Sequence, residues 1–426
     1  MSARGASAAS PPASTTTTVA DAPVQVAHTN LGNVAYRVVG RGPNLVLIMG
    51  YAGTMQTWDP HFVDTLALHF RVITFDNAGI GKTATVRAPL SIDAMADQTS
   101  ALITTLHLGK PDVLGWSMGT MIAESLAIRH SGQVHRLVLC AAYPGVGNAV
   151  QPSQKDVDAL TGSNPAAAQA DLFPSDQNMA ADAFDGSLSA YQSSKSAPTS
   201  VTTAQKNAII AWFDGRDSSG RRANRISVPT LIADGVSDRI DAASNDREVA
   251  AQIAHSHLLL YPDAGHAFLF QEGDLFAFKV RTFLTSQPKA LDKSQIRRGF
   301  LDGYKALTAA GNKWVAGLKK LNTSSSARDL AQLDLRQSDA EAAFDDELLG
   351  FGATASLAPS IRVFTNADEL VARDILAFGA QSGSKAKKWT SIITADGKLV
   401  QATENALRRE LGLSPIPTTT TTVAKH

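Results

Sequence analysis

The chain has 426 residues, of which 44% are hydrophobic, so it is long enough to form two domains with real cores. Its 39 Lys and Arg residues balance 39 Asp and Glu residues, which excludes the basic surface typical of proteins that bind nucleic acids or anionic membranes. The single cysteine, Cys140, excludes an internal disulfide and a Cys-rich metal site. It follows the apolar run Leu137–Leu139 and is predicted to be an inert core residue.

Both ends of the chain have the composition of flexible segments. Residues 1–24 are rich in Ala, Ser, Thr and Pro, and residues 416–426 are rich in Thr, so both are predicted to be disordered tails. No run approaches the ~20 apolar residues of a transmembrane helix, and no apolar signal-peptide core is visible. Such tails are similar to those of exported bacterial proteins whose signal has been removed. This favours an exported or cell-envelope location, with a cytoplasmic location as the alternative.

From residue 34 to residue 141, apolar strand patterns alternate with helical patterns, which predicts a parallel sheet with helices on both faces. A helix is expected over Ser91–Leu108, with Ser91 as its N-cap and Gly109 as its stop. The predicted strands are Val34–Val39, Leu45–Met49, Val72–Phe75, Asp112–Leu114 and Leu137–Ala141.

The pentapeptide Gly115–Gly119 reads Gly-Trp-Ser-Met-Gly and fits the pattern G-x-S-x-G. The run Asp112–Leu114 before it is short and apolar, whereas the run Thr120–Ile128 after it has a helical pattern. The glycines permit the strained backbone that holds a serine hydroxyl on a sharp turn between a strand and a helix. This setting predicts that Ser117 is a nucleophile at the carboxyl edge of the sheet.

A serine hydroxyl is a weak nucleophile, so a histidine base is expected elsewhere in the chain. Among ten histidines, His266 has the setting that such a base needs. It lies in a turn that follows the apolar run Leu258–Tyr261, just past the end of a late strand. His255 and His257 lie before or within that strand. The predicted base is therefore His266.

An acidic residue is expected to orient this histidine. The strand Pro229–Ala233 runs into a loop that contains Asp238, whose carboxylate would accept a hydrogen bond from the His266 ring and fix its tautomer. The segment after the preceding strand, Cys140–Pro144, has no carboxylate. We therefore predict Asp238 as the acid. The alternatives, each of which would otherwise cap a turn or a helix, are Asp234, Asp241 and Asp246.

Acyl transfer also requires two backbone donors that stabilise a tetrahedral oxyanion. The amide of Met118, directly after the nucleophile, is one predicted donor. The other is expected from the loop after the apolar strand Leu45–Ile48, where Gly50 permits a sharp turn and the amide of Tyr51 is the predicted donor. The equal alternative is an ordinary Gly-rich turn between a strand and a loop.

Together these residues resemble the α/β-hydrolase superfamily, of the esterase, perhydrolase and carbon-carbon hydrolase type. The similarity covers about residues 25–286 and includes the Gly115–Gly119 elbow, the Asp238 loop, Phe75–Gly81 and Ala264–Phe268. The resemblance implies an α/β fold with a mostly parallel sheet, helices on both faces and a helical lid.

Two positions depart from the family pattern. Met49 stands where family members often have His, which leaves the donor amide in place but removes a side chain that braces the loop. Ala78 stands where an Arg is frequent, which affects a structural contact and not the chemistry. Asp76, which lies nearby, is predicted to shape a turn and not to catalyse.

A Ser-, Ala-, Asp- and Gln-rich stretch, about residues 146–226, interrupts the sheet pattern before it resumes at Val228. Its position matches that of a lid, which would shape the choice of acyl or leaving group and exclude water. Its apolar residues line a pocket or, equally, pack the lid itself: Leu160, Leu172, Phe173, Met179, Phe184, Leu188, Trp212 and Phe213.

Beyond Phe283 the α/β pattern stops, and residues 290–415 show helical patterns only. Apolar residues recur there at helical spacings in four stripes, which predict a small helical bundle. The stripes span Phe300–Leu321, Leu330–Leu348, Phe364–Phe378 and Trp389–Leu411. Their aromatic residues are expected to form a core and not a ligand site, because apolar faces must be buried. Such a module would dock a partner or self-associate.

The leading hypothesis is a carboxylesterase-like serine hydrolase of a small-molecule ester. Ser117, His266 and Asp238 would act through an acyl-enzyme, with no cofactor and no metal. The same triad serves perhydrolases and carbon-carbon hydrolases. Haloalkane dehalogenation and epoxide hydrolysis are disfavoured, because they use a carboxylate at the elbow. The alternative from another class is a non-catalytic binding or scaffold protein that uses the helical bundle.

Overall fold

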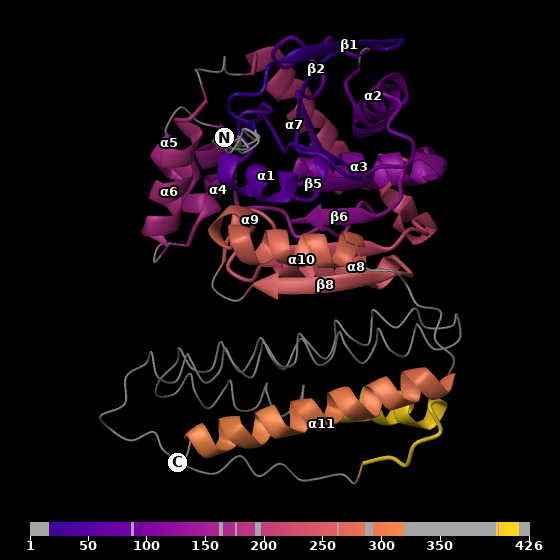
Figure 1. Cartoon of the computed structure of the whole chain (residues 1–426). Coiled ribbons are helices and arrows are strands. Elements are labelled where there is room, and N and C mark those ends of the chain that lie inside the picture. The colour runs from indigo at the N-terminus through magenta and orange to yellow at the C-terminus, as the bar shows by residue number, and fades with distance from the viewer. Residues whose placement is uncertain are drawn as a thin grey trace, which may run out of the picture.

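The computed structural model describes residues 17–86, 89–161, 165–174, 177–191, 197–261, 264–285, 293–318, 398 and 400–416. An eight-stranded sheet in the order β1-β2-β4-β3-β5-β6-β7-β8 forms its centre (Figure 1). Strand β2 pairs antiparallel with β1 and with β4, and the remaining neighbours pair in parallel. The predicted mostly parallel sheet is therefore confirmed. Its strands are β1 (Gln25–Thr29), β2 (Gly32–Val39), β3 (Asn44–Ile48), β4 (Arg71–Phe75), β5 (Asp112–Trp116), β6 (Leu137–Cys140), β7 (Thr230–Gly235) and β8 (Ser256–Tyr261).

Helices connect these strands and cover both faces of the sheet (Figure 1). In chain order they are α1 (Pro60–Ala67), α2 (Ile92–Thr105), α3 (Met118–Arg129), α4 (Gln154–Thr161), α5 (Pro165–Leu172), α6 (Asn178–Leu188), α7 (Thr199–Phe213), α8 (Ala243–Gln252), α9 (Phe268–Gln271), α10 (Gly273–Thr285) and α11 (Lys293–Leu318). Two short 3₁₀ helices are η1 (Ser131–Gln133) and η2 (Gly220–Arg225). Helices α4 to α7 lie between β6 and β7, within the stretch where the sequence predicts a lid.

Successive residues of the central strands feed two separate cores, because side chains alternate between the faces of a sheet. In β3, Val46 and Ile48 belong to one core, whereas Leu45 and Leu47 belong to the other. The first core packs against α2, α3, α7 and α8, and the second packs against α1, α6, α9 and α10. Both faces of the sheet are thus covered, as a parallel sheet requires.

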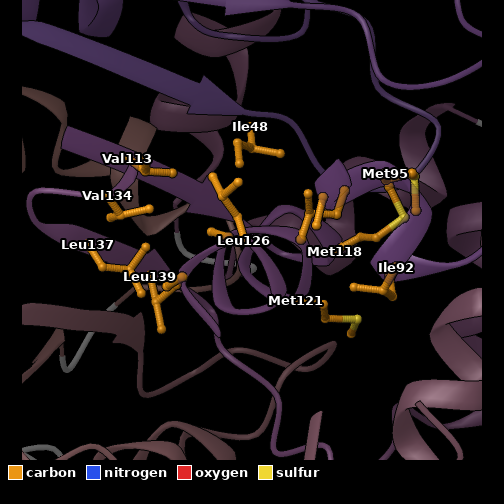
Figure 2. Close-up of a cluster of buried hydrophobic side chains, with 14 of the residues drawn as sticks. Ile48, Ile92, Met95, Val113, Met118, Met121, Leu126, Val134, Leu137 and Leu139 are labelled. Atoms are coloured by element: carbon orange, nitrogen blue, oxygen red, sulfur yellow. The ribbon is translucent and has the colours of Figure 1, made fainter. Parts of the chain in front are cut away.

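Figure 2 shows part of the first core, in which Met118 and Met121 of α3 lie near Ile92 and Met95 of α2. Helix α3 is buried along most of its length, including Met118 at its first position. The helix that follows the Ser117 turn is therefore anchored in the core, and this fixes the position of the turn.

The predicted elements agree with the structure to within three residues at their ends. Ser91 caps α2 through a 3.1 Å hydrogen bond from the Ala94 amide to its hydroxyl. The helix ends at Thr105 and not at Leu108, since the backbone turns left-handed at His107 (φ 52°) and Gly109 (φ 67°). Strand β1 was not predicted, because an edge strand with one buried residue, Ala27, shows no apolar pattern.

Residues 17–24 pack against the domain that contains the sheet, although the sequence predicts a disordered tail up to residue 24. Val19 is fully buried, and its amide donates to the Asp64 carboxylate at 2.8 Å. The Arg37 guanidinium donates to the carbonyl oxygens of Val19 and Ala20. The ordered chain therefore begins at least as early as residue 17, whereas residues 1–16 lie outside the described part.

Two described helical segments fall within the predicted bundle. Helix α11 and residues 400–410 are both helical, and Phe300 and Leu407 are fully buried. The Arg408 guanidinium lies 5.8 Å from the Phe300 ring centre and 5.4 Å from that of Tyr304, so the segments contact each other (Figure 1, orange and yellow). The predicted stripes Leu330–Leu348 and Phe364–Phe378 lie outside the described residues, and the bundle as a whole stays a prediction.

No described helix combines the length and the apolar content that crossing a bilayer requires.

Candidate active site

The turn between β5 and α3 holds Ser117 in strained backbone, with φ 57° and ψ −125°. The two glycines around it are required by close approach. A Cβ on Gly115 would lie 2.3 Å from the carbonyl oxygen of Gly119, and a Cβ on Gly119 would lie 2.1 Å from the carbonyl oxygen of Ile48. Ser117 is half-buried at the N-terminus of α3, where the positive end of the helix dipole favours nearby negative charge.

The structure brings two of the predicted residues into direct contact. His266 Nδ1 donates to Asp238 Oδ2 at 2.6 Å, and both side chains are almost completely buried. The other carboxylate oxygen, Asp238 Oδ1, accepts from the amides of Ile240 and Asp241 at 2.6 and 2.8 Å. The Asp238 carboxylate is thus fixed by its own loop, and it fixes the orientation of the imidazole.

His266 is also tied to the Ser117 turn. The Trp116 indole N–H donates to the carbonyl oxygen of His266 at 2.9 Å, and the two rings lie 5.6 Å apart. Trp116 directly precedes the predicted nucleophile, so the strand that carries Ser117 also positions the His266 loop. Among the described residues, no hydrogen bond joins the Ser117 hydroxyl to the His266 imidazole. Such contacts are often long in unliganded enzymes and shorten on substrate binding.

The loop after β3 passes directly beside Ser117. A Cβ on Gly50 would lie 3.1 Å from the Cβ of Ser117, so a larger residue would make the loop or the turn shift by a few tenths of an ångström. The amide of Tyr51 follows Gly50, and the amide of Met118 follows Ser117. Neither amide donates a hydrogen bond within the described residues, which leaves both available to an anionic oxygen. Their donor role stays a prediction.

Met49, which replaces the more frequent His, does not leave this loop unbraced. The Asn77 amide group donates to the carbonyl oxygen of Met49 at 2.8 Å. Asp76 Oδ1 accepts from the Met55 amide at 2.7 Å, in agreement with a turn-shaping role. Burial raises the pKa of the Asp76 carboxyl to about 6. Two side chains at the end of β4 therefore hold both ends of the loop after β3.

The three alternative acids lie beside Asp238 and do not contact His266 in the described structure. One carboxylate oxygen from each of Asp234, Asp241 and Asp246 lies within 4.8 Å of the others, close enough to hold one cation. Burial raises the pKa of all three, and that of Asp246 reaches about 8. Burial therefore favours the protonated form of these carboxyl groups.

The candidate lid residues differ in their burial and in the residues that they contact. The ring centres of Phe184 in α6 and Phe270 lie 4.8 Å apart, and those of Phe270 and Trp116 lie 5.0 Å apart. Part of the lid therefore packs, through Phe270, onto the residue that precedes Ser117. Trp212 is fully buried and donates to the carbonyl oxygen of Tyr143, which makes it a core residue. Met179 is 87% exposed and lines nothing. These contacts show packing for Phe184 and Trp212, whereas a pocket lining by the lid stays a prediction.

The sequence analysis missed Gln205, whose Oε1 accepts from the Ala52 amide at 2.9 Å. Gln205 lies in the buried stripe of α7, with Val201, Ala208 and Trp212 on the same face. A single polar residue in an otherwise apolar stripe is a signal that could have indicated it, because buried polar groups need partners.

The chain is similar in sequence to a known family and to several of its members. The family model described as "alpha/beta hydrolase fold" matches residues 43–273. BpoC of Mycobacterium tuberculosis (strain H37Rv), which bears the name of a non-heme bromoperoxidase, is 30% identical over 271 residues, covering 60% of this chain and 98% of BpoC. The 2-hydroxymuconate semialdehyde hydrolase of Pseudomonas sp. (strain CF600) is 27% identical over 263 residues, covering 59% of this chain and 90% of that enzyme.

A solved structure shows the same architecture. The α/β-hydrolase fold protein from Chitinophaga pinensis superimposes with a TM-score of 0.57 at 26% identity, covering 63% of this chain and all of that one. The family match covers more than half of the residues, and the chain therefore belongs to the α/β-hydrolase family. The region beyond residue 273, including α11, lies outside the family match.

Proposed function

We propose that this protein is a serine hydrolase that cleaves small carboxylic esters. The observation that carries the proposal is the buried Asp238–His266 pair, which the Trp116 side chain ties to the strained turn of Ser117. A buried carboxylate that fixes an imidazole beside a strained serine is the arrangement that activates a hydroxyl for acyl transfer.

In the first half of the reaction, Ser117 Oγ attacks the ester carbonyl carbon while His266 Nε2 takes the hydroxyl proton. The carbonyl oxygen becomes negative and accepts hydrogen bonds from the amides of Met118 and Tyr51, at the positive end of α3. His266 then gives its proton to the alcohol oxygen, and the alcohol leaves an acyl-enzyme. Asp238 keeps the imidazole in the tautomer that these steps require.

In the second half, water takes the place of the alcohol. His266 removes a proton from the water, whose oxygen attacks the acyl carbon through a second oxyanion. The proton returns to Ser117 Oγ as the carboxylic acid is released. Each step uses groups of the chain and water alone.

The experiment that tests this proposal is intact-mass measurement after treatment with a fluorophosphonate, together with turnover of p-nitrophenyl esters of short acids. We expect one adduct on the wild type and none on Ser117→Ala or His266→Ala, with ester turnover reduced at least ~10³-fold in both. The control is Ser131→Ala, which alters an exposed serine of η1 and should behave as the wild type.

Two outcomes would contradict the proposal. An adduct that persists in Ser117→Ala would place the reactive group elsewhere. A folded wild type that forms no adduct and turns over no ester would favour a binding or scaffold role on a hydrolase fold.

A second candidate is perhydrolysis, which the similarity to BpoC favours, since BpoC bears the name of a non-heme bromoperoxidase. Hydrogen peroxide would attack the acyl carbon in place of water and give a peracid, while His266 takes the peroxide proton. Peracid release in the presence of acetate and hydrogen peroxide, measured by bromide oxidation, separates this activity from simple hydrolysis. Loss of the signal in Ser117→Ala would assign it to the same site.

A further inference from the structure

Gln205 is the one polar residue in the buried stripe of α7, and its side chain is completely enclosed. Its neighbours on this face, Val201, Ala208 and Trp212, pack into the body of the protein. An apolar residue of similar size would fill this position without a desolvation cost. The presence of an amide here therefore needs a specific partner.

That partner is the loop beside Ser117. Gln205 Oε1 accepts from the Ala52 amide at 2.9 Å, a contact between residues 153 positions apart in the sequence. Ala52 has φ 57°, a left-handed conformation that non-glycine residues adopt at a cost in energy. A hydrogen bond to this amide holds the Tyr51–Ala52 peptide, which limits rotation at Tyr51 and so restricts the adjoining Gly50–Tyr51 peptide, whose N–H is the Tyr51 amide.

The loop has other braces, but these come from the sheet. Asn77 holds the Met49 carbonyl oxygen, and Asp76 holds the Met55 amide. Gln205 holds the middle of the loop, and it belongs to the inserted helices between β6 and β7. The inserted region is thus connected to the loop at the point nearest the predicted oxyanion donor.

The other end of the Gln205 amide strengthens this interpretation. Its Nε2 is buried and has no hydrogen-bond partner within the described residues. A buried donor without a partner is unfavourable, so a purely structural position would favour an apolar side chain. Gln205 occupies this position despite the unpartnered donor, and its hydrogen bond from the Ala52 amide is the interaction that offsets the cost.

We propose that Gln205 is a positioning residue: by holding the Tyr51–Ala52 peptide through the Ala52 amide, it limits rotation at Tyr51 and so keeps the adjoining Gly50–Tyr51 peptide, which carries the Tyr51 amide, aimed at the oxyanion. This inference rests on the proposed hydrolase function. It makes α7 part of the catalytic assembly: a displacement of the helix would turn the amide away and disable the site without moving the triad.

Two substitutions test the inference. Gln205→Met fills a similar volume but removes the acceptor, whereas Gln205→Glu keeps an acceptor oxygen for the Ala52 amide whether it is ionised or protonated. The matched control is Asn207→Met, which removes an exposed amide from the same helix. The measurements are kcat and KM for p-nitrophenyl esters, the Ki of an alkyl trifluoromethyl ketone, and the thermal midpoint.

For Gln205→Met we expect kcat to fall ~10- to 100-fold with KM changed less than ~3-fold, because an oxyanion donor acts mainly in the transition state. The Ki of the ketone, which forms a tetrahedral adduct with the serine, should rise by the factor by which kcat/KM falls. Gln205→Glu should recover most of the activity, and Asn207→Met should equal the wild type. The thermal midpoint of Gln205→Met should stay close to that of the wild type.

Other results would overturn the inference. If Gln205→Met retains wild-type kcat and Ki, the loop does not depend on this hydrogen bond. If Gln205→Met and Gln205→Glu lose activity and thermal stability together, the residue serves folding and not positioning. A wild type without ester turnover or adduct overturns the proposed function and this inference with it, so the two failures are distinguishable.

Discussion

The nucleophile side of the site is held by backbone geometry and neutral hydrogen bonds, whereas the acid side is crowded with buried charge. On the first side, Ser117 and the loop at Gly50 approach each other so closely that a Cβ on Gly50 would lie 3.1 Å from that of Ser117. On the second side, Asp238 lies beside three further carboxyl groups, and burial raises the pKa of each of them. The first side therefore tolerates almost no change of shape, and the second should be sensitive mainly to changes of charge.

The largest effect is expected from Asp238→Asn. The Asp238 Oδ1 position accepts two backbone amides, so the asparagine oxygen will occupy it and turn the NH₂ group toward His266. His266 Nδ1 must then accept, which moves the ring proton to Nε2 and removes the base. Ester kcat should fall on the order of 10³- to 10⁴-fold, as the equivalent change does in serine proteases.

The control for this change is Asp241→Asn, which replaces the carboxyl group of a neighbouring acid that contacts Asn245 and not His266. Its kcat should stay within ~10-fold of the wild type. If Asp241→Asn were instead the more harmful of the two, the carboxyl cluster and not the Asp238–His266 contact would determine activity.

A smaller effect is expected from Gly50→Ala on the other side of the site. The added methyl group would lie 3.1 Å from both the Ser117 Cβ and the Trp116 carbonyl oxygen, so the loop must shift by a few tenths of an ångström. We expect kcat to fall ~10- to 100-fold with little loss of stability, because oxyanion donors depend strongly on position. Gly186→Ala is the control, since nothing lies within 4 Å of the added methyl group. Equal kinetics for the two variants would show that the approach at Gly50 has no catalytic importance.

The nucleophile side of the site and the central sheet could be predicted from the sequence more completely than the acid side. The Ser117 turn depends on residues next to one another in the chain, and a strand, two glycines and a helix were enough to predict its fold. The parallel sheet was predictable for the same reason, because its apolar runs are local and long. Edge strand β1 and the packing of Val19 were not predicted, since each has few apolar residues and depends on contacts with distant parts of the chain.

The acid side was less accessible to sequence reasoning. Four acidic residues lie within a stretch of 13 residues, from Asp234 to Asp246 with Asp238 and Asp241 between them, and the sequence alone left three as alternatives. Only the fold shows that Asp238 contacts His266 while the others face one another. Gln205 was missed because its partner, Ala52, lies 153 residues away.

The smallest expected effect is on how the free energy of unfolding depends on pH. This dependence separates the role of charge from the role of shape. Burial and the neighbouring carboxylates raise the pKa of Asp234, and burial raises that of Asp246 from 3.8 to about 8. At a pH between the ordinary pKa of 3.8 and the raised pKa of about 8, the folded state retains protons that the unfolded state has released. The free energy of unfolding should therefore fall as pH rises from about 4 to about 8. The thermal midpoint, measured across this range, should decrease accordingly.

Asp234→Asn should weaken this dependence. Neither carboxylate oxygen of Asp234 receives a hydrogen bond from an amide, hydroxyl or basic donor in the described residues, and its carboxyl faces that of Asp246. A neutral amide can donate to Asp246 without the proton that the Asp234 carboxyl must retain on folding, so the thermal midpoint at pH 8 should rise by ~2–4 °C, equivalent to about 1 kcal/mol. Asp214→Asn, which alters an exposed pair with Arg216, should shift it by less than ~1 °C. If the wild type instead gains stability with rising pH, and gains more on adding Ca²⁺, the carboxyl cluster binds a cation and does not share protons.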